Sequence, residues 1–218
     1  MEIDGRNRRN GQNGEDSEEA NSRRALRSEA AGRVYGKHGG YRQLKAYQLA
    51  ELLYDYTCRF CDRYVPKKDR HHDQMVQAAR SGYQNIAEGS EDSATSRKLE
   101  MNLTNVAKSS IGELNRDYQK HLTRRKLPLW QQGDALFEAA RTLRPKTLEE
   151  AAAWVNQKRG GSTVEERAAN LGAILSAQAH FLTERLLDRQ AREFETGGGF
   201  SERLYKARTS RTGRQGRK

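Results

Sequence analysis

The chain of 218 residues has few cysteines and no long apolar run. Its two cysteines, Cys58 and Cys61, cannot staple a protein of this length, so a disulfide framework is excluded. No segment approaches the roughly 18 to 20 uninterrupted apolar residues that cross a bilayer. The N-terminal residues also lack the apolar core of a signal peptide. We therefore expect a cytoplasmic protein that does not contact a membrane.

Apolar residues are scarce as well, at 34% of the chain with a mean hydropathy of -1.04. This composition is too polar for a compact domain unless part of the chain lies outside a core. Residues 1–38 hold eight Lys/Arg and seven acids among Asn, Gly and Ser, and residues 196–218 hold seven Lys/Arg against Glu202 alone. We expect disordered tails at 1–38 and 196–218 around one folded domain at 39–195.

Basic residues exceed acidic ones, giving a formal charge of +11. The tail at 196–218 carries +6 of this charge, the folded region about +4 and residues 1–38 about +1. A surplus of this size favours a partner that bears phosphate or other anions, although charge alone identifies none. The uneven distribution indicates that the C-terminal tail is the strongest cationic element.

The folded region has helical periodicity and no convincing strand pattern. Apolar residues recur at steps of three and four in segments near 41–64, 69–89, 96–126 and 163–195. Pro66 and Pro128 are expected to end the first and third segments. Asp69 is placed to cap the start of the second helix, and Gly89 is expected to end it. In the third segment the apolar stripe comprises Leu99, Leu103, Val106, Ser110, Leu114, Tyr118 and Leu122. The pattern predicts an all-α fold, an antiparallel four-helix bundle.

Residues 129–161 form an insertion between the third and fourth predicted helices. We expect two short helices here, one at Asp134–Thr142 and one opened by a capping box of Thr147 and Glu150. Trp130, Phe137 and Trp154 are the large apolar residues of the insertion. Packing of these side chains onto the end of the bundle is the expected role, with partner binding as the alternative.

Two runs in the second and third predicted helices resemble a known family. They are "DQMVQAARSGYQNIAEGSEDS", with Asn85, Glu88 and Gly89, and "SSIGELNRDYQKHL", with Glu113. The sequence is similar to the bacterial four-helix-bundle proteins first known as 23S rRNA intervening-sequence proteins, which include the accessory variability determinant of diversity-generating retroelements. The longer, suffix branch of the family is the most similar. The resemblance covers about 41–127 and the fourth helix, but neither the tails nor the insertion.

This resemblance implies a ring of bundles, commonly a pentamer, without enzymatic activity. Retroelement members bind nucleic acid and a reverse transcriptase, so the same partners are expected here. The chain has Val76 and Gln77 where the family commonly has paired arginines, and Tyr83 near the usual position of a proline. By resemblance, the motif residues Asn85, Glu88, Gly89 and Glu113 are structural or form a subunit contact, with Glu88 and Glu113 capping helix ends or pairing between subunits.

Two sets of cations are candidate nucleic-acid-binding residues. The first lies on the third predicted helix, largely opposite its apolar face or in its last turn: Arg97, Lys108, Arg116, Lys120, Arg124, Arg125 and Lys126. The second belongs to the C-terminal tail: Arg203, Lys206, Arg208, Arg211, Arg214, Arg217 and Lys218. A solvated helix face and a solubilising tail are the alternatives. No zinc-finger, helix-turn-helix or RNP-like motif predicts sequence-specific recognition.

Catalytic motifs are lacking. Cys58 and Cys61 lie within a predicted helix, where cysteine acts as a small hydrophobic residue, and the adjacent pair His71 and His72 is poorly spaced for zinc. The sequence has no Gly-rich phosphate loop, nucleophile elbow or Glu-x-x-His pair. We predict a non-enzymatic protein without a cofactor or metal that binds RNA or DNA. The alternatives are a protein-interaction scaffold without nucleic-acid contact and, ranked far lower, a metal or redox enzyme that uses the two cysteines.

Overall fold

The computed structural model describes residues 40–197 and Tyr205. These residues contain only helices, as predicted, and no strand. A short 3-10 turn, η1 (Tyr41–Gln43), precedes six α-helices: α2 (Lys45–Tyr64), α3 (Arg70–Asp92), α4 (Arg97–Arg124), α5 (Ala135–Leu143), α6 (Leu148–Asn156) and α7 (Val164–Gly197). The predicted tail at 1–38, and nearly all of the one at 196–218, lie outside the described residues.

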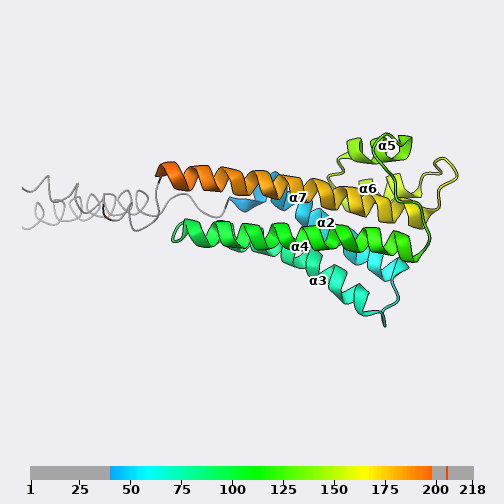
Figure 1. Ribbon diagram of the computed structural model, residues 1–218, viewed down its shortest axis with the longest axis horizontal. Helices are drawn as coiled ribbons and strands as arrows, with labels where there is room; N and C mark the ends of the chain where they lie inside the picture. Colours follow the sequence, from blue (N-terminus) through cyan, green and yellow to red (C-terminus); the bar gives the residue numbers. More distant parts are fainter. Residues whose placement is uncertain (1–39, 198–204, 206–218) are drawn as a thin grey trace, which may run out of the picture. The chain divides into compact units, whose positions relative to one another are not determined.

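The four long helices pack side by side (Figure 1). α4 has its most extensive contacts with α3 and α7, and α2 contacts the same two helices. α4 runs opposite to α7, because Arg97 lies beside Glu193 whereas Arg125, near the other end of α4, lies beside Glu165. The two short helices expected in the insertion are present as α5 and α6. Both pack against α7, and α6 also contacts α2.

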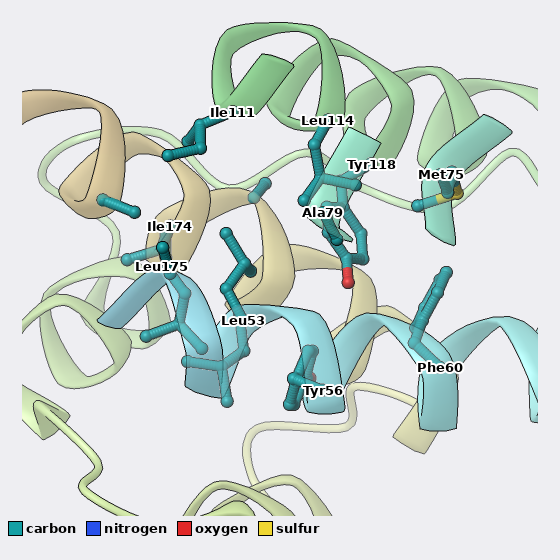
Figure 2. Close-up of a cluster of buried hydrophobic side chains, with 14 of the residues drawn as sticks. Leu53, Tyr56, Phe60, Met75, Ala79, Ile111, Leu114, Tyr118, Ile174 and Leu175 are labelled. Atoms are coloured by element: carbon teal, nitrogen blue, oxygen red, sulfur yellow. The ribbon is translucent and has the colours of Figure 1, made fainter. Parts of the chain in front are cut away.

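The core is formed where apolar faces of the long helices meet (Figure 2). It includes Leu53, Tyr56 and Phe60 of α2, Met75 and Ala79 of α3, Ile111, Leu114 and Tyr118 of α4, and Ile174 and Leu175 of α7. The buried tyrosines retain polar partners: the hydroxyls of Tyr118 and Thr57 lie 2.9 Å apart, and the Tyr56 hydroxyl donates to the Ala168 carbonyl at 2.8 Å. The core therefore buries aromatic rings without leaving their hydroxyls unpaired.

Side-chain caps fix the starts of several helices. The Asp69 carboxylate accepts from the His71 amide at 2.9 Å, as predicted, and Thr147 and Thr163 accept from the amides of Glu150 and Glu166. Each cap satisfies an amide that has no partner within its helix. The caps predicted at Asp69 and Thr147 therefore mark the starts of α3 and α6.

The expectation that Gly89 ends the second helix is wrong. α3 continues through Gly89 to Asp92. A Cβ at Gly89 would lie 3.1 Å from the Glu100 carbonyl oxygen and 3.3 Å from the Leu103 Cβ. This glycine therefore permits a close approach of α3 and α4 rather than a helix stop.

The apolar stripe predicted on the third helix is also partly wrong. Leu99 and Val106 are 41% and 47% exposed. The buried face of α4 instead includes Glu100 and Thr104, which form polar contacts: Thr104 donates to the Glu100 carbonyl, and Gln190 donates to the Glu100 carboxylate. These hydrogen bonds compensate the cost of burying polar groups. Glu100 and Thr104 can therefore lie in the core, although the apolar pattern assigns them to the surface.

Candidate nucleic-acid interface

Arg116 and Lys120 lie on the outward face of α4. Both are exposed, and they are one helical turn apart. Among the described residues, neither forms an ion pair. These two predicted cations are therefore free to contact an anion in solution.

Arg97 and Lys108 instead lie at the contact of α4 with α7. An Arg97 Nη1 is 2.9 Å from Glu193 and 3.4 Å from Glu100, and the Lys108 Nζ is 3.8 Å from Glu184. Their side chains are only 23% and 24% exposed. The paired carboxylates neutralise these two cations and link the helices.

The C-terminal end of α4 has three further predicted cations, at Arg124 and the two residues after it, with different surroundings. Arg125 donates two hydrogen bonds to Glu165, at 2.8 and 3.1 Å. Arg124 lies 3.9 Å from Asp69, whereas Lys126, exposed at a positive φ of 55°, follows the end of the helix. Arg125 is therefore the most firmly tethered member of this group.

The loop between α2 and α3 adds cations that the sequence pattern did not assign to the site. Asp69 belongs to this loop, and its contact with Arg124 places Lys67, Lys68 and Arg70 near the C-terminal end of α4. All three are exposed, although Lys67 also lies 3.7 Å from Asp62. The run "PKKDR", between a helix stop and a helix cap, was the signal that could have identified them.

We define the basic end by its exposed cations: Lys67, Lys68, Arg70, Lys120, Arg124 and Lys126. It combines one loop and one helix terminus that are far apart in the sequence.

Glu165 lies near the basic end, but its carboxylate is hydrogen-bonded to Arg125 and His121. Burial alone would raise the pKa of Glu165, but hydrogen bonds from these two side chains hold it below its ordinary value. Glu165 therefore stays ionised and bound to Arg125 at neutral pH.

Two of the family-like residues, Asn85 and Gly89, lie at the contact between α3 and α4. The Asn85 amide donates to the Ser81 carbonyl at 2.8 Å, and the Ser81 hydroxyl lies 2.9 Å from that of Ser110. Glu88 and Glu113 are exposed within α3 and α4, not at their ends, so the expectation that they cap helices is wrong. Neither forms an ion pair with another described residue. A contact of Glu88 and Glu113 with another subunit stays a prediction.

The two cysteines have surroundings that suppress thiol chemistry. Burial raises the pKa of the Cys61 thiol to about 12 and also raises the pKa of Cys58. The Cys61 thiol contacts the Met75 sulfur at 3.9 Å, inside the core. Within 40–197 and at Tyr205, no three His, Cys, Asp or Glu side chains are grouped to hold a metal ion. Burial therefore disfavours the thiolate form of both cysteines.

These features describe an all-helical protein with a cationic surface at one end of its long helices. Comparisons of the chain with protein-family models, curated proteins and solved structures found no match. The likeness to the intervening-sequence proteins therefore depends on the sequence motifs alone. Among the described helices, none is long and apolar enough to span a membrane.

Proposed function

We propose that this chain is a non-enzymatic accessory protein that binds the phosphate backbone of RNA or DNA. The observation that carries the proposal is the basic end, where six exposed cations from the α2–α3 loop, the first residue of α3 and the end of α4 lie together. Each cation that approaches a phosphate releases condensed counterions, which supplies binding free energy without base recognition. The basic C-terminal tail supplies further contacts of the same kind.

The mode of contact is electrostatic and independent of sequence. Long, exposed Lys and Arg side chains adapt to a backbone but do not by themselves specify base edges. Arg97 and Lys108 are occupied by α7 carboxylates, so they contribute less than the exposed Lys120 and Lys126. The absence of catalysis is part of the proposal, and the raised pKa values of the two thiols support it.

We infer that α2, α3, α4 and α7 form an antiparallel four-helix bundle with residues 129–161 as an insertion. The contacts between the helices support this assignment, because each of the four packs most closely on two of the others. By resemblance to the intervening-sequence proteins, the bundle assembles in the cytoplasm into a ring, commonly a pentamer. The exposed Leu99 and Val106, seven residues apart on α4, are candidates for the subunit contact.

A protein-interaction scaffold is the second candidate. The observation that favours it is the exposure of large apolar side chains on the long helices, such as Phe181 at 58%. Such side chains are suited to a protein partner, of which a reverse transcriptase is the one implied by resemblance. Binding of this kind depends little on salt, which separates it from phosphate contact.

The salt dependence of nucleic-acid binding tests the proposal. Fluorescence anisotropy with a labelled single-stranded RNA and a labelled DNA duplex would be measured over about 50 to 200 mM salt. In the triple variant Lys67→Gln, Lys68→Gln, Lys120→Gln, we expect weaker binding to both probes. On duplex DNA, its log-log salt slope should be smaller by up to about 0.9 for each phosphate that is no longer neutralised.

The matched control removes three exposed cations from α7 by Arg185→Gln, Arg189→Gln and Arg192→Gln. This control removes the same formal charge, but outside the basic end. Equal reductions of affinity in the two triple variants would contradict a localised interface. Binding to a reverse transcriptase with no affinity for either nucleic acid would favour the scaffold.

A further inference from the structure

A small groove lies between α2, α6 and the start of α7, apart from the basic end. It has a volume of about 400 Å³, which includes open solvent. Phe60, Leu148, Val155 and Val164 are among its apolar lining residues, and Arg59 and Arg63 are the charged ones. Among the described residues, no acidic side chain lines it. A site that combines an apolar surface with neighbouring cations is suited to an amphiphilic anion.

The two arginines are one helical turn apart on α2 and share the groove. Like charges at this spacing disfavour a helix by a few tenths of a kcal/mol unless an anion compensates them. Asp62, on the same helix, lies instead against Lys67 and His72, both at 3.7 Å. Arg63 contacts the Tyr64 ring, 5.6 Å from its centroid. Neither Arg59 nor Arg63 forms an ion pair with any other described residue.

A third guanidinium adds positive charge beside the groove. Arg167 is only 2% exposed, and its Nε donates to the carbonyl of Val155, a lining residue, at 2.7 Å. Its other acceptors are the Ser162 carbonyl and hydroxyl. Among the described residues, no carboxylate forms an ion pair with Arg167. These neutral acceptors satisfy hydrogen bonds but leave the buried charge without a counter-ion.

We propose that this groove binds a small amphiphile with one anionic head group. The apolar body packs on the half-buried Leu148 and Val164, and the head group accepts hydrogen bonds from Arg59 and Arg63. The field of the buried Arg167 strengthens the preference for an anion because the site is partly shielded from water.

Isothermal titration of the full chain with decanoate tests the site, with decyltrimethylammonium as the cationic counterpart. Decanoate is expected to bind and the cation is not, although their apolar tails differ by only about one methylene. The double variant Arg59→Gln, Arg63→Gln should bind decanoate at least about tenfold more weakly, since charge-assisted hydrogen bonds are removed. The control variant Arg80→Gln, Arg185→Gln removes equal charge from exposed positions of α3 and α7 and should bind normally.

A second pair of variants tests the location without changing charge. Ala152→Phe fills the groove, because Ala152 lines it, whereas Ala153→Phe places the same ring at an exposed position of α6. Decanoate binding should be abolished in the first variant and kept in the second, with circular dichroism showing that both remain helical. Equal binding of the two amphiphiles, equal effects of the two phenylalanine variants, or no binding of decanoate would overturn the proposal.

Discussion

At the scale of single residues, a glycine decides how closely α4 and α7 approach. A Cβ added to Gly172 would lie 2.8 Å from the Tyr118 Cδ1 and overlap other atoms of that ring. Tyr118 is fully buried and hydrogen-bonded to Thr57, so it has little room to move. We expect Gly172→Ala to lower the free energy of unfolding by about 1 to 3 kcal/mol, the usual cost of overpacking. Urea denaturation followed by circular dichroism measures it.

Gly112 provides the matched control within α4. A Cβ there would lie 3.4 Å from the nearest atom, the His180 Cδ2, which is at ordinary contact distance. Gly112→Ala should therefore leave stability unchanged or raise it by up to about 1 kcal/mol, because alanine has the higher helix propensity. Equal destabilisation by the two substitutions would show that the Tyr118 contact is not the cause.

A buried histidine makes stability depend on pH. Burial lowers the pKa of His121 below its ordinary value of 6.5, although Glu165, 3.0 Å from its Nε2, opposes this shift. The unfolded chain therefore takes up a proton at His121 at higher pH than the folded protein does. As the pH falls below about 6.5, the free energy of unfolding should decrease. Denaturation midpoints between pH 7 and 5 test this expectation.

The substitution His121→Gln should flatten this pH dependence. Glutamine keeps a donor toward Glu165 but does not titrate, and the neighbouring charged or titratable groups Arg125 and His71 are unchanged. The control Thr123→Ala changes an exposed residue of α4 that does not titrate and should retain the original slope. An unaltered slope in His121→Gln would assign the acid sensitivity to another group.

At the scale of elements, the insertion is attached to α7 by a buried amide. Asn170 accepts from the Trp130 amide at 2.9 Å and donates to the Pro128 carbonyl at 2.9 Å. Asn170→Ala would remove both bonds and leave the buried Trp130 amide without its partner. We expect a decrease of about 1 to 3 kcal/mol in the free energy of unfolding. Hydrogen exchange should show faster exchange at the Trp130 amide.

The control for this attachment is an exposed contact between the same parts of the chain. Gln178 of α7 donates to the Arg141 carbonyl of α5 at 2.8 Å. Because water can replace this bond, Gln178→Ala should change stability by less than about 0.5 kcal/mol. If both variants were equally stable, the buried amide would not be what holds the insertion.

Features that depend on neighbouring residues could be predicted from the sequence, whereas features that depend on tertiary packing could not. The cap at Asp69 and the box at Thr147 were predictable because their hydrogen bonds join residues two or three positions apart. The role of Gly89 was not, because it depends on the close approach of α4. Likewise, the charge of Lys68 was visible in the sequence, but its place near Arg124 depends on how α2, α3 and α4 are packed.

At the scale of the whole molecule, positive charge is divided between the basic end and the C-terminal tail. The folded region at 39–195 carries about +4, whereas residues 196–218 carry +6. Several cations of the folded region are held by carboxylates, as Arg125 is by Glu165. The proposed nucleic-acid binding therefore has two separable sources, one fixed on the helices and one in the tail.

A chain that ends at Gly197 tests the contribution of the tail. It lacks seven cations and keeps the basic end, so we expect weaker binding to RNA at low salt and a smaller salt slope. Neutralising Lys67, Lys68 and Lys120 in this shorter chain should reduce the remaining binding further. The control lacks residues 1–38, which carry only about +1, and should bind as the full chain does. If the two deletions weakened binding equally, net cationic charge would not be the reason for the effect. If the chain ending at Gly197 bound as tightly as the full chain, phosphate contact would belong to the helical part alone.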